Sequence, residues 1–175
     1  MKAEDMPLLV ESSGDALYGF CRKLERSKDD ADELFQQTFL CAMELCHKID
    51  LQYKPQSYLF GIAVKIWQGK RTKARRRANL APQVPLDDTV CTAGSAPSAQ
   101  DEAQRKMLTE HLSALANGLP DKFRVVLLMY YGCSLPLADI AAALKLPEGT
   151  VKSRLFKARN LMKKGLEADG YESFE

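Results

Sequence analysis

The sequence predicts an all-α protein with two small helical domains, a helical bundle and a helix-turn-helix domain, joined by a flexible linker. Apolar residues recur at helical spacing along most of the chain, and the alternating runs and Asn-Gly turns of β-hairpins are absent. The composition changes near residue 78, where a segment poor in large apolar groups begins. We therefore place the first domain at residues 1–77, the linker at 78–103 and the second domain at 104–175.

Three helices are expected in the first domain, over residues 6–26, 29–48 and about 56–77. The second has the clearest apolar stripe, and Asp29 or Asp30 is expected to cap it. The third should turn an apolar face inward, formed by Tyr58, Leu59, Ile62, Ala63 and Ile66. Helices of this length with short connections pack as a compact bundle.

The linker contains three prolines and four acidic residues without a basic one, the acids being Asp87, Asp88, Asp101 and Glu102. Beyond it, helical spacing returns with Leu108, Leu112 and Leu115, and Gly118 and Pro120 end that helix. Further helices are expected over 121–131, 136–144 and 148–166.

The last two of these helices form the most specific motif in the sequence. An alanine-rich helix, the turn Lys145-Leu146-Pro147 and a basic helix follow one another, as in a helix-turn-helix. The expected seam between the helices consists of Ile140, Leu144, Leu146, Val151, Leu155 and Ala158. Lys152, Ser153, Arg154 and Lys157 should then face outward, where they can contact bases and phosphates in a major groove. The alternative is a solvated basic face on a structural helix pair.

A second basic segment lies in the first domain. Residues 65–77 carry seven basic residues and no acid, on a helix that also holds Tyr58, Phe60 and Trp67. Aromatic rings beside cations suit single-stranded nucleic acid, since rings stack on bases while cations hold the backbone. The alternative, that Tyr58 and Trp67 are core residues and the cations are solvated, stays open.

The cysteine and histidine residues of the sequence do not predict a cofactor. The five cysteines show no CxxC pair and are expected to be reduced, as in the cytoplasm. A zinc site of Cys41, Cys46 and His47 would lack a fourth ligand, so we expect no metal. No apolar run approaches about 20 residues, so membrane insertion is not expected, and the N-terminus lacks the features of a signal peptide.

Several of these segments resemble the extracytoplasmic-function (ECF) group of sigma factors of bacterial RNA polymerase. ADELFQQTF (31–39) is similar to their core-binding helix in region 2, and QSYLFGIAVK (56–65) to their promoter-melting helix. The stretch 119–166, from LPDKFRVVLLMYYG to EGTVKSRLFKARNLM, is similar to their region 4. The resemblance implies a specificity subunit of RNA polymerase that directs promoter-specific initiation, and not an enzyme.

The resemblance also implies roles for individual residues. The helix that docks on core polymerase would contribute Asp32, Glu33, Leu34, Gln36, Gln37 and Phe39. The minus-thirty-five element would be read by Lys152, Ser153, Arg154 and Lys157. The minus-ten element would be contacted by Tyr58, Lys65, Trp67, Lys70, Arg71 and Lys73. The chain has Tyr58 where the family usually has Trp and Lys65 where it often has Asn, which leaves the identity of the flipped base open.

The partners implied are core RNA polymerase, through the beta-prime clamp and beta flap, promoter DNA and an anti-sigma factor. The acidic linker would either thread a basic polymerase channel or act as a solubilising tether. Two other classes compete with this interpretation. A one-component regulator would need a sensor or receiver domain, but residues 1–77 lack the strand–helix alternation of a receiver. A nuclease or recombinase could use Asp29, Asp30, Asp32 and Glu33, but helix capping and the helix dipole already account for these acids.

Overall fold

The computed structural model of the 175-residue chain describes residues 6–46, 55–78 and 99–171. These ranges form α1 (Met6–Leu24), α2 (Lys28–Glu44), α3 (Pro55–Ala78), α4 (Ala99–Gly118), α5 (Asp121–Leu127), α6 (Leu137–Leu144) and α7 (Glu148–Ala168). A π-helical turn, η3 (Leu128–Gly132), follows α5 directly. No strand occurs within the described ranges, and the all-α class is confirmed.

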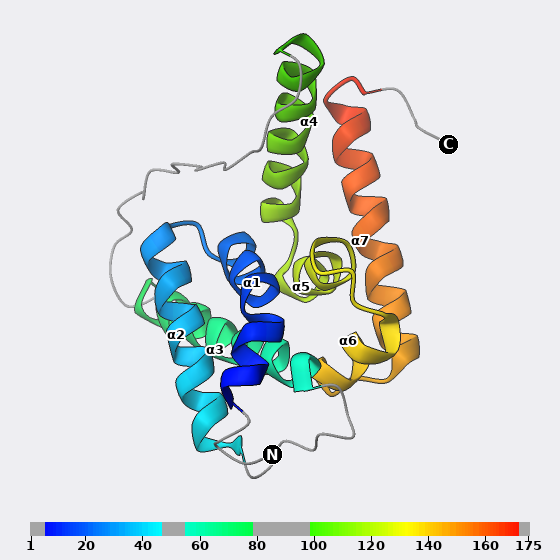
Figure 1. Ribbon diagram of the computed structural model, residues 1–175. Coiled ribbons are helices and arrows are strands. Elements are labelled where there is room, and N and C mark those ends of the chain that lie inside the picture. Colours follow the sequence, from blue (N-terminus) through cyan, green and yellow to red (C-terminus); the bar gives the residue numbers. More distant parts are fainter. Residues whose placement is uncertain (1–5, 47–54, 79–98, 172–175) are drawn as a thin grey trace.

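The helices form two groups that lie against each other (Figure 1). In the first half, α2 packs on α1 and α3 around buried side chains that include Leu17, Phe20, Leu34, Leu59 and Ala63. In the second half, α5, α6 and α7 enclose Val125, Val126, Ile140, Val151 and Leu155. Each half therefore has a set of apolar side chains removed from water, which is the main favourable term in folding.

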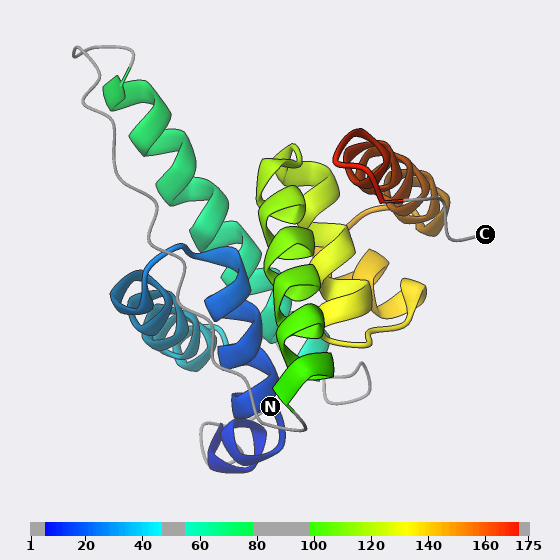
Figure 2. The ribbon, with the colours of Figure 1, turned by 90° about the horizontal axis from the view of Figure 1, so that it is seen from above.

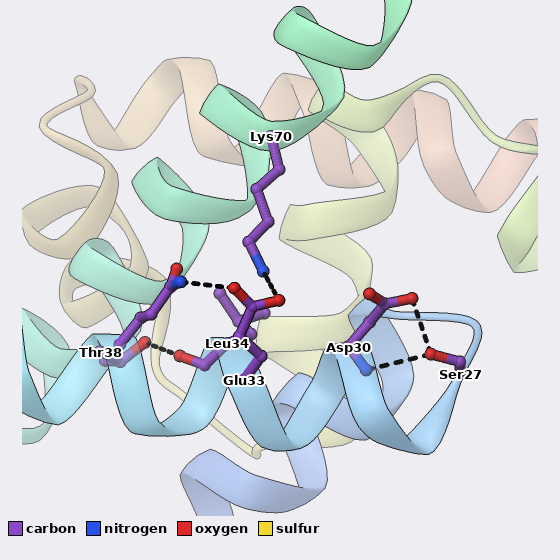
Figure 3. A network of polar contacts seen from close by, with 7 residues as sticks. Ser27, Asp30, Glu33, Leu34, Thr38 and Lys70 are labelled. Atoms are coloured by element: carbon purple, nitrogen blue, oxygen red, sulfur yellow. Dashed lines mark hydrogen bonds and ion pairs between the residues drawn. The ribbon is translucent and has the colours of Figure 1, made fainter.

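The start of α2 corrects one sequence prediction. Its N-cap is Ser27 rather than Asp29 or Asp30. The Asp30 amide donates to Ser27 Oγ at 3.0 Å, and the Ser27 hydroxyl donates to Asp30 Oδ2 at 2.6 Å (Figure 3). Ser27 Oγ thus satisfies one of the free amides of the first turn, and the Asp30 carboxylate accepts a hydrogen bond from the Ser27 hydroxyl.

Two other boundaries differ from those expected. Helix α4 begins at Ala99, so residues 99–103, at the end of the segment expected to be a flexible linker, are helical. The segment Ala99-Gln-Asp-Glu-Ala-Gln is short of large apolar groups, but most of its residues have high helix propensity. The helix expected over 121–131 is regular only to Leu127 and then widens into η3.

Helix α4 lies beside α7 in both views of the ribbon (Figures 1 and 2). A β-carbon on Gly165 of α7 would stand 2.6 Å from Cδ2 of Leu115, so the absence of a side chain lets α4 approach closely. At the far end, His111 Nε2 lies 3.0 Å from Asp169 Oδ2, and the His111 ring lies against Tyr171. Helices α4 and α7 are therefore joined by an apolar contact at Leu115–Gly165 and by a polar contact at His111–Asp169.

Candidate nucleic-acid interface

The turn between α6 and α7 has the hydrogen bonds of a helix-ending Schellman motif. The amide of Leu146 donates to the Ala141 carbonyl at 2.9 Å, and the amide of Lys145 donates to Ala142 at 3.3 Å. Lys145 itself takes the left-handed conformation, with φ of 53°. This conformation reverses the chain within a few residues and starts α7 at Glu148.

The seam expected between these helices is present. Ile140, Val151 and Ala158 are completely buried and Leu155 is nearly so. Leu144 and Leu146 are half-buried and pack against the same cluster. The opposite side of α7 is thereby left to face solvent.

The four predicted groove-reading residues lie on the early turns of α7. Lys152, Ser153 and Lys157 are exposed and Arg154 is half-buried. Lys152 Nζ lies 3.1 Å from Glu148 Oε1, and the Ser153 hydroxyl donates to the Thr150 carbonyl at 3.0 Å. The structure therefore brings the predicted set together on one short stretch of helix.

Sequence analysis missed an apolar element beside this face. Phe156 is 64% exposed although it follows the seam residue Leu155. Farther along α7, a shallow groove is lined by Phe123, Lys157, Asn160, Leu161 and Lys164. The signal was available in the sequence, because one residue after a buried position in a helix lies about 100° around the axis.

The predicted minus-ten residues of α3 fall into two sets. Lys65 and Lys73 are exposed and Tyr58 is half-buried, with its pKa raised by that burial. Trp67 is only 1% exposed, so its ring cannot stack on a base in this conformation. Phe60 is also buried and meets Phe20 edge-to-face, with 5.2 Å between ring centroids. For Trp67 the core alternative fits the structure, and Phe60 is a core residue as well.

The other two residues of that set, Lys70 and Arg71, form ion pairs. Lys70 Nζ lies 2.8 Å from Glu33 Oε2 of α2, as Figure 3 shows. Arg71 Nε donates to Asp121 Oδ2 of α5 at 3.1 Å, and its guanidinium lies 4.9 Å from the centre of the Trp67 ring. Beyond them, Arg75, Arg76 and Arg77 are exposed at the end of α3, which projects past the other helices (Figure 2).

The predicted docking residues of α2 are held by local contacts. Tyr18 donates to Asp32 Oδ1 at 2.7 Å, a hydrogen bond that raises the pKa of the tyrosine. Gln37 Nε2 donates to Glu33 Oε1 at 2.6 Å, and Gln36 is exposed. Phe39 meets Phe35 edge-to-face.

One member of the predicted docking set, Leu34, faces the interior of the protein. Leu34 is completely buried, so it supports the helix from inside and cannot touch a partner. Leu40 and Met43, which were not predicted, are 60% and 51% exposed on the same helix. These two are better placed than Leu34 to supply an apolar contact to a docked protein.

The structure also bears on metals and membranes. Within the described residues, no cluster of three or more His, Cys, Asp or Glu side chains could hold a metal ion. His47, one ligand of the conceivable zinc site, lies outside the described ranges. Among the described helices, none combines the length and apolar character that a membrane span requires.

Comparison with known proteins identifies both halves. The family described as Sigma-70 region 2 matches residues 9–77, and Sigma-70, region 4 matches residues 109–162. The ECF RNA polymerase sigma factor SigW of Bacillus subtilis strain 168 is 24% identical over 164 residues, which cover 90% of this chain and 87% of that protein. The chain belongs to the ECF group of sigma factors.

Other comparisons agree with the assignment of this sigma factor. SigM, another ECF sigma factor of Bacillus subtilis strain 168, is 26% identical over 84% of this chain and 86% of its own. The sigma factor RpoE from Bartonella quintana, in complex with the anti-sigma factor NepR, superposes with a TM-score of 0.77 at 20% identity. That match covers 95% of this chain and 99% of RpoE. CnrH, in complex with the cytosolic domain of CnrY, gives a TM-score of 0.68, also at 20% identity, over 95% of this chain and 90% of CnrH.

Proposed function

We propose that this sigma factor binds core RNA polymerase and directs it to specific promoters. The observation that carries the proposal is the pairing of a region 2 match at one end with a region 4 match at the other. The region 4 match includes a helix-turn-helix whose basic residues lie on one stretch of α7, with Lys152 and Lys157 exposed and Arg154 half-buried. No chemical step is assigned to the chain, and its place of action is the cytoplasm, with the polymerase.

Region 4 reads the minus-thirty-five element through the start of α7. A recognition helix enters the major groove with its N-terminal residues toward the base edges. Arg154, Lys152 and Lys157 supply cations for guanine edges and phosphates, while Ser153 supplies a hydroxyl. Phe156, exposed on the same turn, can meet the methyl group of thymine, an apolar contact that discriminates thymine from cytosine.

Region 2 captures the minus-ten element as the duplex opens. The exposed cations of α3 hold the backbone of the displaced strand, and Tyr58 offers an aromatic edge to an unstacked base. Extruding a base from the stack costs roughly a few kcal/mol of free energy, and binding of that base by region 2 offsets this cost. The loop 50–55 is expected to help form the pocket for the extruded base, and its residues 50–54 lie outside the described ranges.

Docking on polymerase uses the exposed part of α2 on the beta-prime clamp and region 4 on the beta flap. Once both domains are fixed on the enzyme, the second DNA contact becomes intramolecular and gains a high effective concentration. An anti-sigma factor that covers these surfaces would prevent docking. The acidic linker acts either within a polymerase channel or as a tether, and the two alternatives remain equal because residues 79–98 lie outside the described ranges.

The proposal is tested by transcription from a pool of promoters with core polymerase, with and without the chain. We expect initiation at a specific subset of promoters only when the chain is present. A gel shift with duplex DNA alone separates the competing regulator, which would bind without polymerase. Absence of association with core polymerase together with unchanged start sites would refute the proposal.

A further inference from the structure

One acidic residue lies on the surface proposed to meet DNA. Residues 145–164 carry seven basic residues and a single acid, Glu148, which is the first residue of α7. A recognition helix enters the major groove with its N-terminal residues toward the base edges. Because like charges that are brought together weaken binding, a carboxylate at this position is costly unless the groove offers it a hydrogen-bond donor.

Glu148 forms an ion pair with Lys152 at the start of α7. Glu148 Oε1 lies 3.1 Å from Lys152 Nζ, and the side chains are 49% and 61% exposed. The turn from α6 leads directly into this end of α7 (Figure 1), through Lys145 in the left-handed conformation and the N-cap Pro147. Residues four apart share one face of a helix. The pair therefore presents an acceptor and a cationic donor side by side.

Two effects within the helix explain part of this arrangement. An acid in the first turn interacts favourably with the helix dipole, and a Glu–Lys pair four residues apart adds a small further gain in helix stability. Neither effect depends on the sequence of the DNA. If they were the whole role of Glu148, its replacement would change the stability of α7 but not the base preference.

The edge of a G·C base pair in the major groove fits the Glu148–Lys152 pair. Guanine offers two acceptors, N7 and O6, and cytosine beside them offers the donor N4–H₂. An ammonium group can donate to the guanine acceptors while a carboxylate accepts from cytosine N4. The hydrogen bond between N4 and O6 spans about 2.9 Å, close to the 3.1 Å between Nζ and Oε1. The two side chains therefore match this edge in both chemistry and spacing.

The A·T edge fits the same ion pair poorly. Its donor, adenine N6–H₂, lies between two acceptors, adenine N7 and thymine O4. A carboxylate that accepts from N6 would therefore lie beside an acceptor that Lys152 does not cover. Repulsion of this kind is one way in which a binding surface rejects the wrong partner. Glu148 thus contributes selectivity through what it repels as well as through what it binds.

We propose that Glu148 and Lys152 together read one G·C base pair of the minus-thirty-five element, with Glu148 on cytosine and Lys152 on guanine. Glu148 is the specificity-determining residue of the two, because acceptors for a lysine occur in every base pair whereas a carboxylate needs the donor of cytosine or adenine. The inference rests on the proposed function, since it requires that α7 enters the groove of a promoter.

The test variant is Glu148→Gln, as the full chain with core polymerase, assayed on a promoter library in which every position of the minus-thirty-five element is varied. Glutamine keeps the shape of the side chain but loses the charge, and its amide can also donate to base acceptors. We expect the preference for G·C over A·T at one base pair to fall about tenfold, equivalent to about 1.4 kcal/mol. Preferences at the other positions should stay unchanged.

Glu167→Gln is the matched control. Glu167 also pairs with a lysine four residues away, Lys163, near the other end of α7, with 3.9 Å between Nζ and Oε1. The change removes the same charge from the same kind of pair, so it should leave every base preference as it is. A loss of G·C preference in both variants would mean that overall charge, and not contact with a base, sets the preference, and the inference would be wrong.

Lys152→Ala provides an independent arm. If both side chains read the same base pair, Lys152→Ala should alter the same position as Glu148→Gln. The double variant should then lose less discrimination than the two single losses add up to, because the residues act as a unit. Effects at different positions, or strictly additive losses, would show that Glu148 and Lys152 act separately and would refute the joint reading.

The remaining outcomes separate this inference from the proposed function. If the unmodified chain directs initiation at specific promoters and Glu148→Gln selects the same sequences, the inference fails while the proposed function stands. If Glu148→Gln raises the use of all sequences equally, the carboxylate only repels DNA and the inference fails as well. If the unmodified chain selects no promoters with core polymerase, the proposed function fails and the inference fails with it.

Discussion

Lys70 of α3 forms an ion pair with Glu33 of α2, with 2.8 Å between Nζ and Oε2. The pair joins the helix proposed to hold the minus-ten strand to the helix proposed to dock on polymerase (Figure 3). Gln37 donates to the other oxygen of Glu33, so the carboxylate is held from two sides. Docking that engages Glu33 would therefore release the lysine toward DNA.

The first prediction follows from this pair. Glu33→Gln should change the free energy of unfolding by less than about 1 kcal/mol, because the pair is partly exposed to solvent. It should free Lys70 for phosphate, so the slope of log affinity for single-stranded DNA against log salt should steepen by about 0.7. Fluorescence titrations over a range of salt concentrations measure this slope. Glu44→Gln removes the same charge at the exposed end of α2 and should leave the slope unchanged.

A second prediction concerns the proposed reading face of α7. Arg154→Ala and Lys157→Ala should each weaken use of promoters that carry a minus-thirty-five element, by about 1–3 kcal/mol if the side chain pairs with a base. Competitive transcription on promoter pairs with intact and altered elements gives the discrimination directly. Lys163→Ala, near the end of the same helix, is the control. Equal effects of all three changes would mean that α7 attracts DNA without reading it.

The left-handed residue of the helix-turn-helix gives a third prediction. Lys145 has φ of 53°, a conformation in which a β-carbon is strained and glycine is not. Lys145→Gly should therefore raise the free energy of unfolding by about 0.5–1 kcal/mol, since helix ends of this type favour glycine. Urea denaturation followed by circular dichroism measures it. Lys145→Ala removes the same charge but keeps the β-carbon, so an equal gain in that variant would exclude the conformational cause.

The buried thiols give a prediction for alkaline pH. Burial raises the pKa of Cys21 to about 12 and that of Cys133 to about 11, from 9.0. Because the folded pKa is the higher one, the neutral thiols favour the folded state, fully below pH 9 and progressively less as the pH rises toward these values. Above about pH 9, each group should cost up to about 1.4 kcal/mol of stability per pH unit.

This dependence can be isolated with Cys21→Ala. Its free energy of unfolding should start lower at pH 8, because a buried sulfur is lost, but should fall less steeply than that of the unmodified chain as the pH is raised. Lysines and tyrosines titrate in both proteins and cancel in the comparison. Parallel curves would show that Cys21 is not protected from ionisation in the folded state.

Helical periodicity predicted the elements well because it depends on neighbours three and four residues away. The seam from Ile140 to Ala158 and the inward positions Leu59 and Ala63 are buried as expected. Local capping was harder, since Ser27, Asp29 and Asp30 are all good cap residues and only the path of the chain selects Ser27. The widening at η3 carries no comparable signal in the sequence.

The candidate site was predicted less completely, because the type of a residue does not determine whether its side chain faces solvent or the interior. Trp67 and Leu34 both lie within the region 2 match, but both are buried. The partners of Arg71 and Lys70, Asp121 and Glu33, lie far along the chain or on another helix. Such ion pairs depend on how whole helices pack together, and the spacing of residues in the sequence does not reveal them.

The contact of α4 with α7 ties the start of the second half of the chain to the proposed reading helix. The two helices meet at Leu115–Gly165 and again at His111–Asp169. Because of these two contacts, a change in the direction of α4 would also turn α7, so a substitution on α4 would alter promoter reading without touching DNA.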